Sequence, residues 1–350
     1  MNFKGAQIAA FLCASVVVLS GTSFAKLNEE TLNICYYGTG DDINKALKSK
    51  KLSINDKDDA GYTALMYAAA YNPNESAVTA LLKAKAQPNA TDPEGKTALM
   101  HAMGNSNIKV TTALLHAQAK TNVKDKSGVT PLMLACQNSQ DAELVNLLLK
   151  NKAPYDVVDK NGFSPLIYAA YNTNEEIIKA LLNKGARDTR TDKDGWNALF
   201  HAAANNTNAN VLYALLSSGA DLTITDKKGR TPLLVAAASN TSFDVIYYLY
   251  QVGFDPFAVD KDGNTALHLA AEYQTNPEVF LTIYELNDGE GNYYFNPAAK
   301  NKAGKTPYDL IKTNQALAKD ENIQQAINDR SIQSVGNAIN TIGGILNLFR

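Results

Sequence analysis

A short pattern recurs through most of this 350-residue chain. It consists of a glycine, a variable residue, a threonine or a substitute for it, an alanine or proline, a leucine, and then an alanine pair. Successive copies are 33 or 34 residues apart, except for a last step of 41. A fixed period of this length predicts a stack of helical repeats that bury their apolar faces against one another. We number the repeats 1 to 8 by their glycines: Gly61, Gly95, Gly128, Gly162, Gly195, Gly229, Gly263 and Gly304.

Each copy has the features of a helix start. Glycine suits a turn with positive φ, and the residue two positions later is a good N-cap. Proline then follows in four copies, at the helical position where a missing N–H costs least. Alanine pairs allow inner helices to approach closely, and leucine pairs mark a second, outer helix. The expected N-caps are Thr63, Thr97, Thr130, Ser164, Asn197, Thr231, Thr265 and Thr306.

Asparagine-rich turns join the two helices of several repeats, at residues 72–75, 172–175 and 205–208. Asparagine tolerates the left-handed conformation, and it also caps the helix that follows such a turn. The turns before each glycine are nearly uniform, as in Asp192-Lys193 and Asp226-Lys227. Uniform tips predict a structural role for these residues rather than partner recognition.

The repeat resembles the ankyrin-repeat family, whose motif is G-x-T-P-L-H-x-A-A followed later by L-L and G-A-D. The resemblance covers roughly residues 32–313. It implies an all-α repeat solenoid, an ankyrin-repeat stack of about eight helix-pair repeats with β-hairpin-like connecting loops. We expect an N-terminal capping repeat at 26–60 and a repeat domain at 61–330, which includes a C-terminal capping repeat at 304–330. The histidine that follows the leucine in the family motif is present only as His268. In the other repeats, the hydrogen bonds that this histidine usually makes to the backbone are therefore in doubt, although the fold is not.

Residues 1–25 have the features of a signal peptide. Lys4 provides a positive charge, residues 8–19 are apolar, and the small residues Ser23 and Ala25 suit a peptidase site. We expect cleavage after Ala25 and a periplasmic or secreted protein, with an uncleaved N-terminal anchor as the alternative. The frequent Asn and Lys residues and the short signal favour a bacterial exported protein.

The last segment, residues 331–350, predicts an amphipathic tail. Its apolar residues are separated by steps of three and four, which is a helical seam. Its other residues are mostly polar and uncharged, and three glycines disfavour an isolated helix. We expect a helix that forms on contact with the last repeat, a second chain or a membrane. The apolar residues are Ile332, Val335, Ile339, Ile342, Leu346 and Phe349.

Signals of catalysis and metal binding are missing from the sequence patterns. The 33 basic and 35 acidic residues give no basic excess, so no nucleic-acid partner is expected. His101 and His201 lie three repeats apart, about 30 Å for packed helices, and cannot share a metal ion. Cys35 and Cys136 are separated similarly and should stay free. The insertion at 288–292 lacks the spacing of a calcium loop. We expect no cofactor, no metal, no catalytic residue and no enzyme activity.

Partner binding is expected on the concave face, as the resemblance implies. Aromatic residues gather there in repeats 4 and 5, at positions where other repeats hold Lys, Asn or Arg. Exposed aromatics are favoured in binding hot spots, although several could pack between repeats instead. We expect Trp196 to be the main anchor, with little effect of its removal on folding. The candidates are Trp196, Phe163, Tyr168, Tyr171, Tyr62, Tyr67, Tyr71, His101, His201 and Arg230.

These observations favour a non-catalytic protein–protein interaction scaffold, exported from the cell, with a protein partner and a monomeric repeat domain. An envelope protein that uses its C-terminal tail for membrane or oligomer contact is the alternative. A third possibility is a small-molecule or enzyme function in the concave groove, for which the sequence offers no residue pattern.

Overall fold

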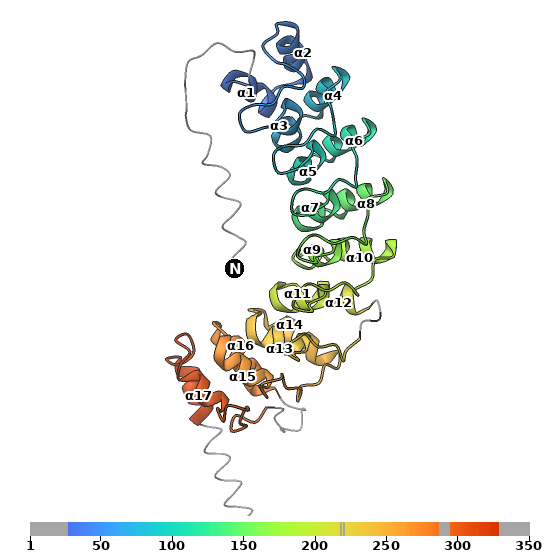
Figure 1. The fold of residues 1–350 in the computed structure, drawn as a ribbon. Coiled ribbons are helices and arrows are strands. Elements are labelled where there is room, and N and C mark those ends of the chain that lie inside the picture. Colours follow the sequence, from blue (N-terminus) through green and yellow to red (C-terminus); the bar gives the residue numbers. More distant parts are fainter. Residues whose placement is uncertain (1–26, 218, 220, 287–294, 329–350) are drawn as a thin grey trace, which may run out of the picture.

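The computed structural model describes residues 27–217, 219, 221–286 and 295–328. Its helices form antiparallel pairs that stack into an all-α repeat solenoid, which confirms the fold class (Figure 1). The predicted signal segment, most of the insertion in the last step, and the tail lie outside these residues. The pairs are α1 (Glu29–Tyr37) with α2 (Gly40–Lys48), α3 (Ala64–Tyr71) with α4 (Glu75–Lys83), α5 (Ala98–His101) and η3 (Ala102–Gly104) with α6 (Ile108–His116), α7 (Pro131–Asn138) with α8 (Ala142–Lys150), α9 (Pro165–Ala170) with α10 (Glu175–Lys184), α11 (Ala198–Asn205) with α12 (Ala209–Leu216), α13 (Pro232–Ser239) with α14 (Phe243–Gln251), α15 (Ala266–Tyr273) with α16 (Pro277–Glu285), and α17 (Pro307–Ile311) with a helix at 321–328.

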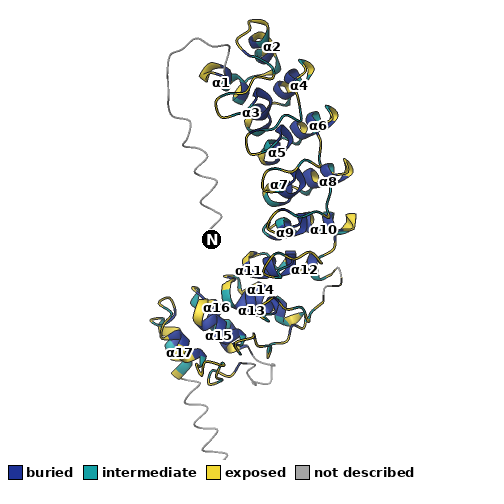
Figure 2. Ribbon diagram, in the orientation of Figure 1, coloured by how far each residue is buried: buried dark blue, intermediate teal, exposed yellow. Residues whose placement is uncertain are grey.

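The stack is curved, and its first helices of each pair lie along the concave side from α1 to α11 (Figure 1). A continuous buried core runs between the layers, as the dark ribbon in Figure 2 shows. Ala203 and Ala237 are fully buried on successive inner helices, where a larger side chain would separate the layers. The two leucines of a pair differ in burial: Leu181 is fully buried, whereas Leu182 is only partly buried.

The predicted helix starts are confirmed. All eight N-cap side chains accept a hydrogen bond from the amide of the third helical residue. The preceding repeat glycines have φ between 75° and 88°. At His268, Nδ1 accepts from the Thr265 amide. In two repeats without this histidine a methionine sulfur takes over, 3.5 Å from the Thr63 amide and 3.4 Å from the Thr130 amide.

The asparagines of the turns do something the sequence analysis missed. They do not use the left-handed conformation that asparagine tolerates: Asn72 has φ −77°, and no described asparagine has a positive φ. Instead, in every described turn between paired helices from Asn72 to Asn314 except the one at Ser139, one buried or half-buried side-chain amide donates to carbonyls of the preceding repeat. The Asn206 amide donates to Ala170 at 2.9 Å and to Asn172 at 2.8 Å. Equivalent bonds are made by Asn72, Asn105, Asn172, Asn240, Gln274 and Asn314.

This amide ladder satisfies carbonyls at the ends of inner helices, where no intrahelical donor exists. The ladder lacks an amide at Ser139, whose hydroxyl donates locally to the Asp141 carbonyl instead. The second asparagine caps the outer helix as predicted in the turns at 172–175 and 205–208, whereas Asn74 in the turn at 72–75 makes no side-chain cap hydrogen bond. The Asn174 side chain, for example, accepts from the Glu176 amide at 3.0 Å. Successive repeats are therefore joined by buried polar contacts as well as by apolar packing.

We predict that Asn206→Ala lowers the free energy of unfolding by about 2–4 kcal/mol, because two buried carbonyls lose their donor. The matched control is Asn210→Ala on α12, where the side chain is exposed. The measurement is urea unfolding followed by circular dichroism. Equal midpoints for the two variants would show that the ladder contributes nothing to stability.

One residue of the framework departs from the repeat. Asp188 lies seven residues before its repeat glycine, where other repeats hold Ile54, Tyr155 or Leu222. Its carboxylate accepts from the first two amides of α11, those of Ala198 at 2.7 Å and Leu199 at 3.0 Å. Burial raises the pKa of Asp188 to about 6, although the two amides favour the charged form.

We predict a pH-dependent contribution of Asp188 to stability. Because its folded pKa of about 6 exceeds the value of about 3.9 for an unfolded aspartate, the native state binds the proton more tightly. The contribution is therefore fully present below pH ~4 and is lost as the pH rises through ~6. Asp188→Leu, which introduces the residue found at 222, should remove this slope from urea midpoints measured between pH 4 and pH 7. Parallel pH profiles for the two proteins would contradict the assignment.

Candidate interaction surface

The connecting loops of repeats 1 to 7 are organised by an aspartate three residues before the repeat glycine, which we call the tip aspartate; repeat 8 has Asn301 at this position. Antiparallel bridges between Lys57 and Thr63 and between Thr91 and Thr97 show the predicted hairpin-like pairing. In repeat 5, one oxygen of Asp192 accepts from the amides two and four residues later, at 2.8 and 2.9 Å. The same pair of bonds is made by Asp92, Asp125, Asp159, Asp226 and Asp260.

Neighbouring hairpins are also bonded to one another. The Lys160 amide donates to the Ser127 carbonyl at 2.9 Å, and the Lys227 amide donates to the Asp194 carbonyl at 3.2 Å. Lysine ammonium groups add bonds between hairpins in both directions, from Lys57 to the Thr91 carbonyl of the next hairpin at 2.7 Å and from Lys302 to the Lys261 carbonyl of the preceding one at 2.6 Å. These contacts explain why the tip residues are nearly uniform, and they agree with the structural role expected for them.

The second oxygen of the tip aspartate reaches the concave face. In repeats 1 and 4 it accepts from a tyrosine hydroxyl, Tyr67 to Asp58 at 2.6 Å and Tyr168 to Asp159 at 3.0 Å. In repeats 2 and 5 its partner is a histidine Nε2, His101 with Asp92 at 2.9 Å and His201 with Asp192 at 3.1 Å. The tips and the concave residues, for which the sequence predicts separate roles, are therefore joined by hydrogen bonds in the structure.

His201 has a defined tautomer because its two nitrogens face different partners. A carboxylate oxygen only accepts, so Nε2 carries the proton toward Asp192. Nδ1 therefore accepts from the Tyr171 hydroxyl at 2.8 Å. Burial lowers the pKa of His201, although Asp192 opposes this effect. The imidazole is thus a neutral, buried link between the tip of repeat 5 and the Tyr171 side chain of repeat 4.

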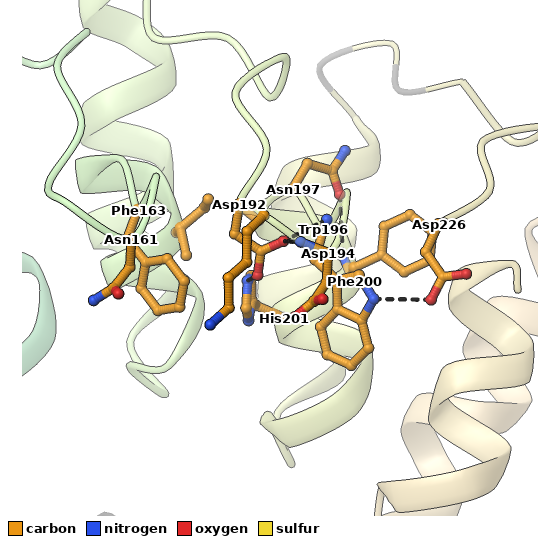
Figure 3. A network of polar contacts seen from close by, with 12 residues as sticks. Asn161, Phe163, Asp192, Asp194, Trp196, Asn197, Phe200, His201 and Asp226 are labelled. Carbon is orange, nitrogen blue, oxygen red and sulfur yellow. Dashed lines mark hydrogen bonds and ion pairs between the residues drawn. The ribbon is translucent and has the colours of Figure 1, made fainter. Parts of the chain in front are cut away.

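Trp196 lies between repeats 5 and 6, where it makes the inter-repeat contacts that the sequence left open as an alternative for the aromatic residues. Its indole N–H donates to Asp226 at 2.9 Å, as Figure 3 shows. Its ring is stacked on Phe200 at 6.0 Å and meets His201 edge-on at 5.3 Å. The guanidinium of Arg230 lies 5.4 Å from the indole centroid and also binds Asp226 at 2.7 Å. Trp196 therefore belongs to the packing between repeats, while part of it stays accessible.

The central cluster, which we define as Phe163, Tyr168, Tyr171, Trp196 and His201, brings five predicted residues together. Phe163 lies 4.9 Å from His201 and 6.0 Å from Tyr168, measured between ring centroids. Tyr171 completes it, 5.4 Å from His201. All except His201 are partly exposed. The predicted gathering of aromatic residues in repeats 4 and 5 is thus present as one contact network.

A second group, the N-terminal cluster, contains Tyr62, Tyr67, Tyr71 and His101. Tyr62 lies 5.4 Å from Tyr67 and 5.2 Å from His101. Sequence reasoning missed one member: Tyr36 on α1 contacts Tyr67 at 5.5 Å and Tyr71 at 5.2 Å. The available signal was its place near the end of the first helix, one residue before Tyr37, which corresponds to Tyr71. Tyr71 itself is 57% exposed, the most open of these predicted residues.

The two clusters are built alike, three repeats apart. Tyr62 and Tyr67 correspond to Phe163 and Tyr168, and His101 corresponds to His201, at separations of 100 or 101 residues. The tyrosine and histidine bonds to the tip aspartates are the same in both. Repeat 3 interrupts the pattern with the aliphatic Leu134. They differ at the position after the second glycine, which is Lys96 in one and Trp196 in the other.

An open cleft of about 520 Å³ adjoins the central cluster. Phe163, Tyr171, Trp196 and His201 line its apolar part, and the hairpin tips line its edge. The exposed charges at this edge are Lys193, Lys227, Lys228 and Asp194, an excess of positive charge. Another cleft, of about 660 Å³, lies beside Asp188 and Gly219, but its lining is mainly small and polar.

Reactive groups are scarce on this surface. Cys35 and Cys136 are fully buried free thiols, and burial raises the pKa of both, that of Cys35 to about 12. The described residues contain no cluster of three or more His, Cys, Asp or Glu side chains arranged to hold a metal ion. Within the same part of the chain, none of the helices has both the length and the apolar character needed to cross a membrane.

The comparison with known families agrees with the architecture. A family model for ankyrin repeats in three copies matches residues 31–125, 69–159, 132–226 and 199–292. The chain belongs to the ankyrin-repeat family. Ankyrin repeats generally mediate protein–protein interaction, and proteins built from them are typically non-catalytic. Among curated proteins, none matches the sequence significantly.

We predict that Trp196→Ala lowers the free energy of unfolding by about 1–3 kcal/mol, because it removes a stacked ring and a hydrogen bond between ankyrin repeats. Trp196→Phe should cost less, since the ring packing is retained. Circular dichroism is the appropriate signal, because Trp196 is the only tryptophan. An unchanged urea midpoint for Trp196→Ala would mean that the indole does not support the fold.

Proposed function

We propose that this protein is a non-catalytic scaffold that binds a protein partner through its concave face, with the central cluster as the main contact. The observation that carries the proposal is the combination of Phe163, Tyr171 and Trp196 at an open cleft. The Tyr171 hydroxyl is bonded to His201, the Trp196 indole N–H is bonded to Asp226, and the Phe163 ring packs against His201, so the three rings are positioned before a partner arrives. Preorganised aromatic side chains lose little entropy on binding and are frequent hot spots.

We expect the partner to place a segment in this cleft that has an apolar side chain flanked by acidic residues. The apolar floor formed by Phe163 and Trp196 suits the first feature. The excess of Lys193, Lys227 and Lys228 over Asp194 suits the second. Such rim charges act mainly on the rate of association and on specificity, so binding should weaken with salt. The N-terminal cluster offers a related second contact about 30 Å away.

A non-catalytic role is supported by the state of the polar groups. His201 has both ring nitrogens in hydrogen bonds and a lowered pKa, so it is not available as a free base. The thiols are buried away from the concave face and have raised pKa values. A nucleophile would need an adjacent base at an accessible site. Binding therefore accounts for the surface better than chemistry does.

We further propose that the protein acts in the periplasm or outside the cell. The sequence of residues 1–25 supports this, because it has the charge, apolar stretch and small residues of a cleavable signal. Cell fractionation tests the location independently of partner binding. Recovery of the protein in the cytoplasmic fraction with residues 1–25 still attached would contradict export.

The binding face is tested by introducing a photo-crosslinking amino acid in the native host. Asn161 is exposed and lines the cleft, and Asn146 is exposed on the outer helix α8. The proposal predicts a discrete protein adduct from position 161 and none from position 146. The adduct should weaken when Lys227 and Lys228 are both changed to glutamate. Equal adducts from both positions, or none from position 161, would contradict the concave site.

A further inference from the structure

The outer helices differ in the side chains they present to solvent on the convex side. One exposed or half-exposed position recurs in register on every outer helix from α4 to α16. It is polar in the first four repeats and apolar in the next three. The residues are Thr79, Thr112, Asn146, Lys179, Tyr213, Tyr247 and Leu281.

This change places apolar side chains in register on the packed helices α12, α14 and α16. We call them the outer stripe and define it as Tyr213, Phe243, Tyr247, Tyr248 and Leu281. Tyr213, Phe243 and Tyr247 are 57%, 44% and 40% exposed. Tyr213 contacts Tyr248 across the repeat boundary at 6.5 Å, and Phe243 is stacked on Tyr247 at 5.6 Å. Neighbouring exposed rings of this kind mark a contact surface.

The described chain ends beside this stripe. The helix at 321–328 packs against α16, where the Tyr284 hydroxyl donates to the Ala326 carbonyl at 3.4 Å. α16 in turn packs against α14. Residues 329–350 would form a helix about 30 Å long, whereas packed helices are about 10 Å apart. The segment that follows is therefore long enough to reach Leu281, Tyr247 and Tyr213.

We propose that residues 331–350 of the same chain cover the outer stripe as an amphipathic helix. The seam of six apolar residues from Ile332 to Phe349 supplies a matching apolar face. The opposite face carries uncharged Asn, Gln and Ser, and Arg350 is the single charge of the segment. The three glycines make this helix weak by itself, so it needs a surface to form on.

The chain's own tail suits the stripe better than a membrane or a second copy. A membrane-binding helix usually carries lysine or arginine along its polar face, and this one has none before Arg350. A tethered segment is also present at a higher effective concentration than a second molecule. The stripe lies on the outer helices, away from the concave cluster, so this inference does not depend on the proposed partner site.

The test is hydrogen exchange by mass spectrometry on the full chain. The tail amides should exchange at least about tenfold more slowly than in an unstructured peptide. Tyr247→Lys should abolish this protection, whereas Asn146→Lys, at the equivalent position of repeat 3, should leave it intact. Ile339→Lys and Asn340→Lys form the matching pair within the tail. Tail amides that exchange without protection in the unaltered protein, or that stay protected in Tyr247→Lys, would overturn the proposal.

Engineered disulfides test whether the tail that covers the outer stripe belongs to the same chain or to a second copy. Tyr247→Cys combined with Ile342→Cys should crosslink within one molecule, and the native cysteines are buried and should not interfere. Asn146→Cys combined with Ile342→Cys should not crosslink. A product of dimer size would assign the stripe to the tail of a second copy and overturn the intramolecular assignment. Tail protection that appears only with anionic phospholipid vesicles would likewise overturn it.

Discussion

The tip aspartate is the interaction on which much of this structure depends. One of its oxygens gathers two amides of the hairpin, and in four repeats the other holds a side chain of the concave face. A carboxylate can accept several hydrogen bonds at once, which a hydroxyl or an amide oxygen does less well. The same residue therefore shapes the loop and positions the surface that the loop adjoins. Framework and recognition are coupled through single side chains.

Repeat 6 shows what happens when the inner helix cannot provide a polar partner. Its equivalent position holds Val235, which has no donor. Asp226 instead accepts from Trp196 of the repeat before it and from Arg230 of its own hairpin. A buried carboxylate without donors would be costly. This substitution of partners joins repeats 5 and 6, and it also places the indole and the guanidinium at the edge of the cleft.

Local signals in the sequence were sufficient for the fold. The spacing of the glycines, the N-cap residues and the prolines act within one helix start, and they predict the pairs from α3 onward. The amide ladder was not predicted, because Asn206 is bonded to residues 34 and 36 positions earlier. That pairing depends on how the layers stack. The inter-repeat contacts of Trp196 were not predicted for the same reason, since its partner Asp226 lies in the next repeat and the comparison of sister positions could not reveal it.

The candidate site was predictable as a set of residues but not as a network. The aromatic positions followed from the repeat register, whereas their bonds to the tip aspartates depend on the distance between a loop and an inner helix. Tyr36 was missed because the first helix pair lacks the repeat motif. The equivalent positions of His101 and His201 were visible in the sequence. That they belong to two similar clusters became clear only from the structure, in which Tyr67 and Tyr168 make the same bond to a tip aspartate.

The central claim is that a tip aspartate fixes the state of a side chain on the concave face. The most direct measurement is long-range ¹H–¹⁵N correlation NMR of the histidine side chains, with the exposed His116 as the internal reference. We predict that His201 is neutral at pH 7, with its proton on Nε2, and that its tautomer is not averaged. A charged imidazolium at pH 7, or an imidazole that exchanges between both tautomers, would contradict the account.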